Sequence, residues 1–340
     1  MSKTVFRNAA DLGNLLTNLP SADRAAEGQA AERQAQLTKP QGSLGRLEEL
    51  AIWLASWQGL KKPALDHPVC LVFAGNHGVA ARGVSAYPPE VTAQMVLNFE
   101  AGGAAINQLT KLAEADLKVT ALDLDRPTQD FTEAPAMSEA ECCAALQIGA
   151  DAVPQDADLL MLGEMGIGNT TSAAAVCNAV FGGSAADWIG PGTGVDDAGL
   201  ALKSEAVTKA IALHGKDQGT AFDCLRTVGG RELAAIAGAV VEARHRRIPV
   251  LLDGFISTAA ASVLTRDNPA ALDHALISHT SMEPGHKRLA EKLDKRPVLD
   301  LDLRLGEASG AAVALLIVRA ALATHNGMAT FGEAGVSTAS

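Results

Sequence analysis

Two glutamates that follow glycine are the residues best placed to do chemistry in this sequence. Glu164 lies in Gly-Glu-Met-Gly and Glu307 lies in Leu-Gly-Glu-Ala-Ser-Gly, each just after a short apolar run. A carboxylate desolvated in a cleft has a raised pKa, which suits it to accept a proton near neutral pH. Either glutamate alone is also explained as an acidic partner of a helix dipole, worth about 0.3 to 1 kcal/mol. Two of them at equivalent positions favour an acid/base pair.

The stretch around Glu164 is also typical of an anion site. Residues 158–162 form an apolar run of strand length, residues 163–171 are rich in glycine and hydroxyl groups, and an Ala-rich helical stretch follows. A helix that begins after a glycine turn presents N–H groups and its dipole to a phosphate. The glycine spacing matches neither a P-loop nor Gly-x-Gly-x-x-Gly, which argues against ATP hydrolysis and NAD chemistry. A tight turn without any ligand is the alternative.

The composition limits the class of protein and of ligand. Of the 340 residues, 48% are hydrophobic and only 4% are aromatic, which suits Ala-rich helices packed on a parallel sheet. The 28 basic and 39 acidic residues give a formal charge of −11, which disfavours nucleic acid and an anionic membrane surface as partners. No apolar run reaches transmembrane length and the first residues lack the apolar core of a signal peptide, which predicts a cytoplasmic protein. The cysteines and histidines show no metal-ligand spacing, so we expect no metal.

From about residue 61 the sequence alternates between short apolar runs and longer helical stretches. This pattern is typical of an α/β protein with a doubly wound, mainly parallel, Rossmann-like sheet. The six predicted strands are residues 69–73, 117–124, 159–162, 249–252, 275–278 and 298–303. Residues 1–60 have helical periodicity instead, which indicates a separate helical part.

Polar residues gather where the predicted strands end, which is where such a sheet binds its ligands. A second glycine loop, residues 190–194, precedes a helix that carries Lys203 and could face the same ligand. A third loop, residues 37–46, holds two cations and is either a turn between helices or a cover for an anionic ligand. The polar stretches after the strands are residues 74–78, 83–88, 163–171, 253–254, 279–286 and 304–307.

Several single residues in these loops have more than one explanation. His77, His279 and His286 are each explained as well by a structural hydrogen bond as by proton transfer. Ser85 and Ser281 lie outside any Gly-x-Ser-x-Gly context, so a hydrolase triad is disfavoured.

Five separated motifs together resemble the nicotinate-nucleotide:dimethylbenzimidazole phosphoribosyltransferases of cobalamin biosynthesis. The motifs are residues 37–48, 74–79, 163–171, 278–286 and 303–310, and the resemblance runs in order from about residue 30 to residue 335. It implies a large α/β catalytic domain of residues 61–325. It also implies a small helical domain built from both chain ends, residues 1–60 with 326–340, and a homodimer in which segment 39–46 approaches the partner's site.

The resemblance implies transfer of phosphoribosyl from nicotinate mononucleotide to 5,6-dimethylbenzimidazole. The products are α-ribazole 5′-phosphate and nicotinate, with inversion at the anomeric carbon and with no cofactor. The pyridinium leaves as a neutral ring and needs no acid, whereas the attacking imidazole must lose its other N–H proton, so one base is needed. By resemblance Glu307 is that base, and Glu164 stabilises positive charge on the ribose or assists the proton transfer.

The resemblance also assigns the binding residues. The phosphate and ribose contacts are Gly166, Ile167, Gly168, Asn169, Thr170, Thr171, Lys203 and Ser281. The benzimidazole pocket lies near Val84, Ser85, Tyr87, Gln94 and Leu305.

Two positions depart from the family pattern. Asn76 stands where the family more often has an aspartate, which argues against an ionic role there, and Pro191 stands where a larger or polar residue is usual.

Two other functions stay open: a transferase that uses another benzimidazole, a purine or a phenol, and a non-catalytic sensor of nucleotide or benzimidazole. The carboxylate pair favours an enzyme, because a sensor of neutral bases and phosphates gains little from two acids in its cleft.

Overall fold

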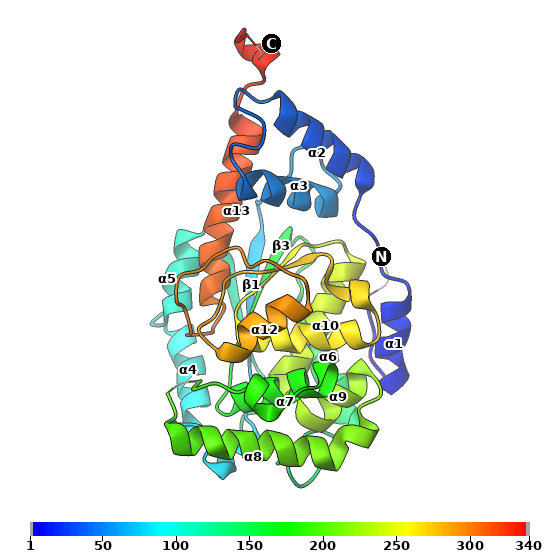
Figure 1. The fold of residues 1–340 in the computed structure, drawn as a ribbon, viewed down its shortest axis with the longest axis vertical. Helices are drawn as coiled ribbons and strands as arrows, with labels where there is room; N and C mark the ends of the chain where they lie inside the picture. The colour runs from blue at the N-terminus through cyan, green and yellow to red at the C-terminus, as the bar shows by residue number, and fades with distance from the viewer. Residues whose placement is uncertain (1–2, 193, 338–340) are drawn as a thin grey trace.

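A parallel sheet with helices on both faces forms the centre of the molecule (Figure 1). The computed structural model describes residues 3–192 and 194–337, and within these ranges the sheet has five strands. They pair in the order β2-β1-β3-β4-β5, and every pairing is parallel. The predicted doubly wound α/β fold is confirmed. The strands are β1 (Pro68–Ala74), β2 (Asp116–Ala121), β3 (Leu159–Met165), β4 (Val250–Leu252) and β5 (Ala275–Ile277).

The sixth predicted strand, residues 298–303, does not form a ladder. It makes one parallel bridge between His279 and Leu299, and Val298 N donates to Ile277 O at 3.0 Å. Pro297 has no N–H to donate, and Asp302 has φ +54°, which is outside the extended region. The segment therefore runs beside β5 without continuing the sheet, which has five strands rather than the six we predicted.

Helices cover both faces because side chains alternate along the buried strands. On β1, Val69, Leu71 and Phe73 join the larger hydrophobic cluster, with α6, α7, α9, α10 and α11. Cys70 and Val72 join the other cluster, with α3, α5 and α13. The helices are α1 (Ala9–Thr17), α2 (Arg24–Gln36), α3 (Arg46–Gln58), α4 (Glu90–Glu100), α5 (Ala105–Leu112), α6 (Glu139–Ala152), α7 (Asn169–Phe181), α8 (Asp197–His214), α9 (Ala221–Val228), α10 (Arg231–His245), α11 (Phe255–Ser262), α12 (Pro284–Lys292), α13 (Ser309–Gly327) and α14 (Phe331–Ala334). Short 3₁₀ segments are η1 (Gly78–Arg82), η2 (Ala185–Asp187), η3 (Gly215–Asp217), η4 (Val263–Arg266) and η5 (Pro269–Leu272).

At one end of the molecule, α2 and α3 from the N-terminal part of the chain lie beside the end of α13 (Figure 1). Leu37 forms an antiparallel bridge with Thr330, and the Arg33 guanidinium donates to His325 O at 2.8 Å. In contrast, α1 packs against α9, and Thr4 Oγ1 donates to Glu242 of α10 at 2.7 Å. The predicted small domain of residues 1–60 with 326–340 stays a prediction, with α1 lying on the large α/β part.

The long helix α13 links this end to the sheet. Its 19 residues are long and apolar enough to cross a membrane by length and composition alone, with a mean hydropathy of 1.2. Its apolar side chains, among them Leu315 and Val318, belong to the second hydrophobic cluster, and the helix contacts α3, α5, β3 and β4. Such packing is that of a core helix, and it fixes the start of α13 at the carboxyl end of the sheet.

Candidate active site

Glu164 lies at the carboxyl end of β3, where the strand meets the loop into α7. The residue is 5% exposed, and one carboxylate oxygen accepts a hydrogen bond from the Asn169 amide. Burial raises the pKa of Glu164 well above its ordinary value, and the carboxylates of Asp253, Glu232 and Glu307 raise it further. Ionisation of Glu164 is therefore less favourable than ionisation of an exposed glutamate.

Glu307 lies in the turn before α13 and is 6% exposed. Burial, followed by the charge of Asp253, raises the pKa of Glu307 to about 7. Such a carboxylate is partly ionised at neutral pH, as a general base must be. Glu307 and Ala308 have φ values of +63° and +64°, and such a conformation costs non-glycine residues on the order of 1 to 3 kcal/mol each. The surrounding structure holds this turn in a strained form.

Two glycines bring the Glu307 turn against the end of β3. A Cβ atom added at Gly163 would lie 2.8 Å from Ala308 Cα, so glycine permits the close approach of β3 and the turn. Gly306 has φ +84°, and a Cβ atom there would lie 2.7 Å from Glu164 Oε1. The turn that carries Glu307 therefore packs directly on the Glu164 carboxylate.

The loop after Glu164 turns sharply into α7. Gly168 has φ +93° and precedes Asn169, the first residue of the helix. Ile167 N donates to Thr92 Oγ1 of α4 at 3.2 Å, which fixes the loop against that helix. The positive end of the α7 dipole lies here and favours an anion.

Lys203 of α8 reaches the same loop. Its ammonium group donates to Thr170 Oγ1 at 3.0 Å and to Gly190 O at 2.9 Å, and the residue is 2% exposed. Burial lowers the pKa of Lys203, while the nearby Glu283 carboxylate opposes that shift. A buried cation beside Thr170 adds to the dipole of α7, so a phosphate is favoured at this corner.

A cavity lies over the Glu164 carboxylate and the β3–α7 loop. The predicted site residues that line it are Glu164, Gly166, Ile167, Asn169, Thr170, Ser281 and Leu305. Its lining also includes His279, Glu283 and Arg304, which we did not predict as site residues. Of the described residues, those predicted for the site but absent from the lining are Val84, Ser85, Tyr87, Gln94, Gly168, Thr171, Lys203 and Glu307.

The residues absent from the lining fall into different environments. Thr171 is fully buried inside α7, and Val84 is buried in the larger hydrophobic cluster. Tyr87 and Gln94 are exposed on the segment that leads into and along α4. Glu307 adjoins the cavity through Gly306, which is part of its lining.

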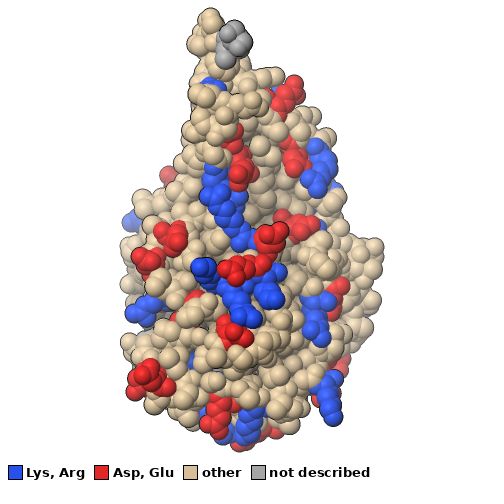
Figure 2. Space-filling view, in the orientation of Figure 1, with Lys and Arg blue, Asp and Glu red and all other residues tan. Residues whose placement is uncertain are grey.

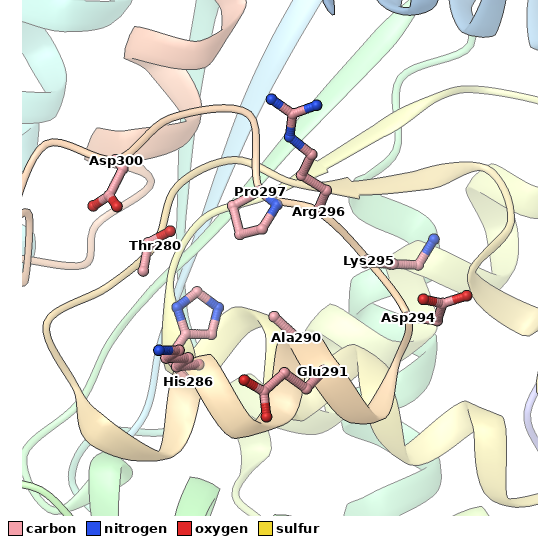
Figure 3. A pocket seen from close by; sticks show the side chains of 10 residues that line it. Thr280, His286, Ala290, Glu291, Asp294, Lys295, Arg296, Pro297 and Asp300 are labelled. Carbon is pink, nitrogen blue, oxygen red and sulfur yellow. The ribbon is translucent and has the colours of Figure 1, made fainter.

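A second cavity, of about 540 Å³, lies between α12 and the segment that follows it (Figure 3). On this face of the molecule, charged side chains of both signs gather near the centre (Figure 2). Thr280 and His286 line the second cavity, whereas Ser281 and Glu283 line the first, so segment 280–286 separates the two. The second cavity mixes the cations Lys287, Lys295 and Arg296 with the carboxylates Glu291, Asp294 and Asp300, so its charge does not select an anion.

The sequence from residue 19 to residue 336 matches a family model described as phosphoribosyltransferase. The chain belongs to this phosphoribosyltransferase family. A relative from Ruegeria sp. (strain TM1040) is 58% identical over 328 residues, which are 96% of this chain and 97% of that protein. Another from Jannaschia sp. (strain CCS1) is 59% identical over 315 residues, which are 93% of this chain and 94% of that protein. Both bear the name nicotinate-nucleotide–dimethylbenzimidazole phosphoribosyltransferase.

Solved structures agree with this assignment. A crystal structure of CobT from Thermus thermophilus has a TM-score of 0.87 and 42% sequence identity with this phosphoribosyltransferase. The comparison covers 93% of this chain and 100% of that one. The family resemblance inferred from five motifs and the α/β fold are therefore confirmed.

The phosphoribosyltransferase carries polar contacts that no sequence motif revealed. Glu283 Oε1 accepts a hydrogen bond from Gly192 N at 2.8 Å, and the Arg304 guanidinium donates to Gly192 O at 3.4 Å. These two side chains hold the second glycine loop through the N–H and the carbonyl of a single residue. Both lie in segments that follow predicted strands, but only the fold shows which loop they hold.

Asn76 and His77, which follow β1, both make side-chain contacts within the fold of the phosphoribosyltransferase. The Asn76 amide donates to Leu124 O at 3.0 Å, so this departure from the family pattern ties the ends of β1 and β2. His77 Nε2 pairs with Glu232 Oε1 at 2.5 Å, and both side chains are fully buried. The pair lies under the β3–α7 loop, since a Cβ atom at Gly166 would lie 3.2 Å from Glu232 Oε1.

Gly306→Ala is expected to lower kcat on the order of 100-fold, because the new Cβ atom displaces the Glu164 carboxylate and a misplacement of about 1 Å has that effect. Gly102→Ala is the matched control. Gly102 has φ +78° and open space around its Cβ position, so alanine there adds backbone strain without touching the site. Steady-state kinetics and thermal melts of both variants test this. Equal kcat values for the two variants would contradict the packing argument.

Proposed function

We propose that this chain transfers phosphoribosyl from nicotinate mononucleotide to 5,6-dimethylbenzimidazole, giving α-ribazole 5′-phosphate and nicotinate. One observation carries the proposal: two buried carboxylates adjoin an anion corner at the end of β3, in a chain of this family. The named relatives bear that activity in their names. The function inferred from the sequence is therefore retained.

The reaction balances with the groups that the site provides. One imidazole nitrogen forms a bond to the anomeric carbon as the bond from that carbon to nicotinate breaks, with inversion. Nicotinate leaves with a neutral ring, and the proton on the other imidazole nitrogen passes to Glu307. A pKa of about 7 makes Glu307 able to take this proton near neutral pH. Glu164, held by Asn169, faces the positive charge that develops on the ribose.

The phosphate of the donor is placed against residues 166–171, with Lys203 and Ser281 as further contacts. The Lys203 ammonium beside Thr170 and the dipole of α7 support this placement. Leu305 borders the cavity, which suits a place beside the benzimidazole. Val84, Ser85, Tyr87 and Gln94 complete the acceptor pocket in this proposal, on a segment tied to the phosphate loop by the bond from Ile167 N to Thr92.

The proposed function extends to the assembly and its place in the cell. We place the enzyme in the cytoplasm as a homodimer, in which the loop of residues 39–46 approaches the site of the partner. That loop is anchored in one chain by an ion pair of 2.8 Å between Lys39 and Glu48, and Arg46 donates to Arg296 O at 3.3 Å beside the second cavity. The proposed reaction takes no cofactor.

The test is to incubate the purified protein with nicotinate mononucleotide and 5,6-dimethylbenzimidazole, without added metal, and to follow both products by chromatography. Equal amounts of nicotinate and α-ribazole 5′-phosphate are expected. Nicotinate without the ribazole product would indicate hydrolysis or a different acceptor base. Binding of both substrates without turnover would contradict the proposal and favour a sensor.

A further inference from the structure

Asp253 occupies a central position that the proposed reaction does not use. It lies between β4 and α11 and is 1% exposed. Its Oδ1 atom accepts a hydrogen bond from Ala311 N in the first turn of α13 at 3.0 Å. The N–H groups of Gly310 and Ala308 also lower the pKa of this carboxyl group. Asp253 N donates to Leu162 O of β3 at 3.2 Å. One residue thus joins β3, β4 and the start of α13.

His279 supports Asp253 from the segment after β5. It is 1% exposed, and its Nε2 atom lies 3.6 Å from Asp253 Oδ1. Two glycines leave room for the His279 ring. A Cβ atom added at Gly254 would lie 3.0 Å from its Nε2 atom, and a Cβ atom added at Gly310 would lie 2.6 Å from the same atom. Neither ring nitrogen has a hydrogen-bond partner among the described residues, and the ring lines the active-site cavity.

The start of α13 is the part of the helix that carries the active-site turn. Glu307 and Ala308 have left-handed backbone conformations. The backbone N–H groups of Ala308, Gly310 and Ala311 favour the ionised form of the Asp253 carboxylate. A strained turn of this kind persists only where neighbouring groups hold it. Asp253 supplies such a hold within a few residues of the Glu307 carboxylate.

The charged and titratable groups around Asp253 come from several elements. Burial raises the pKa of Asp253, while the charge of His279 opposes that shift. In turn, Asp253 raises the pKa values of Glu307 before α13, Glu164 on β3 and the Cys70 thiol on β1. Asp253 is therefore a like charge near both glutamates of the site.

We propose that Asp253, supported by His279, is a positioning residue for the transferase: it fixes the Glu307–Ala308 turn and places a second negative charge near the Glu307 carboxylate. The proposal rests on the proposed function, in which Glu307 accepts the proton. It differs from a purely structural role for Asp253 as a cap of α13. A cap affects the stability of the fold, whereas a positioning residue also affects the proton affinity of Glu307 and the chemical step.

Asp253→Asn separates the two roles, because an amide oxygen can still accept the bond from Ala311 N while the charge is lost. Removal of a like charge makes Glu307 easier to ionise, so the acidic limb of the kcat/KM profile should move to lower pH by about one unit. A weaker base also removes a proton less readily, so kcat should fall about tenfold with KM nearly unchanged. The measurements are full pH profiles with both substrates, and thermal melts.

Asp267→Asn is the matched control. Asp267 Oδ1 accepts a hydrogen bond from Ala221 N at 3.0 Å in the first turn of α9, which is the same kind of contact outside the active-site cavity. This variant should keep the wild-type kcat and pH profile. A pH profile for Asp253→Asn that matches wild type, with only a lower melting temperature, would overturn the proposal and leave Asp253 as a helix cap.

His279→Gln provides a second test if Asp253→Asn does not fold. Loss of the imidazole removes the charge that opposes the rise in the pKa of Asp253, so Asp253 ionises less readily and raises the pKa of Glu307 less. The acidic limb should therefore move to lower pH, as in Asp253→Asn. An unchanged limb in this variant would also count against the proposal. Wild-type protein that forms no ribazole product at all would instead refute the proposed function, so the two failures are distinguishable.

Discussion

Glu307→Gln is expected to lower kcat by about 100- to 10,000-fold, the contribution typical of a general base, while KM for both substrates changes little. Glutamine has almost the same shape as glutamate, so the strained turn and its packing on Glu164 should survive. Wild-type kcat/KM should rise as pH increases through about 7, where the Glu307 carboxylate ionises. The variant should lose that limb. Product formation measured over a range of pH on both sides of this value tests both statements.

The same substitution should stabilise the fold at alkaline pH. The pKa of Glu307 in the folded protein is raised from 4.5 to about 7, so the unfolded chain ionises more readily and the fold loses stability as pH rises between these values. The shift corresponds to a cost on the order of 3 kcal/mol above about pH 7. Above that pH, Glu307→Gln should therefore unfold at a higher denaturant concentration than wild type. This advantage should shrink as the pH falls toward the ordinary pKa of glutamate.

Glu291→Gln serves as the control for a lost carboxylate. Glu291 is an exposed residue on α12 that faces the second cavity, so its substitution should change neither kcat nor the pH profile. If Glu307→Gln instead kept a kcat near wild type, Glu307 would not be the base. The proton would then have to pass to another group, and Glu164→Gln would be the next variant to assay.

The sequence predicted those parts of the molecule that local pattern determines. Buried apolar runs of strand length lie where β1, β3, β4 and β5 form, and glycine with hydroxyl residues follows β3 as expected. Glu164 and Glu307 each follow glycine near the end of a predicted strand, and this pattern predicts both as site residues. Gly306 then proved to be the contact between them, since its Cβ position lies against Glu164 Oε1.

Other features depend on contacts that sequence spacing does not encode. Segment 298–303 is apolar enough for a strand, but β5 offers only three residues and Asp302 leaves the extended region, so no ladder forms. Asp253 and Glu283 lie in polar stretches that follow predicted strands, but the sequence does not show what their carboxylates contact. Their roles arise because the fold places them opposite Ala311 N and Gly192 N, which are 58 and 91 residues away along the chain.

Lys203→Met is expected to raise KM for nicotinate mononucleotide about 10- to 100-fold, as the loss of a charge-assisted hydrogen bond worth about 1.5 to 3 kcal/mol predicts. Methionine keeps much of the buried stem of the lysine but removes the cation beside Thr170. KM for 5,6-dimethylbenzimidazole should change far less, because that substrate carries no phosphate. Inorganic phosphate, tested as a competitive inhibitor, should bind wild type more tightly than the variant.

Lys209→Met is the control that separates phosphate recognition by Lys203 from a general loss of positive charge. Lys209 is exposed on the same helix, α8, so its substitution should leave KM for nicotinate mononucleotide unchanged. Lys203 also ties the β3–α7 loop to Gly190 O and opposes the buried charge of Glu283, so its loss should lower thermal stability as well. The two effects separate in the phosphate titration. A variant that melts earlier yet binds phosphate as wild type does would show that Lys203 only joins the two loops, and the phosphate would then have to be held by the α7 dipole and Ser281.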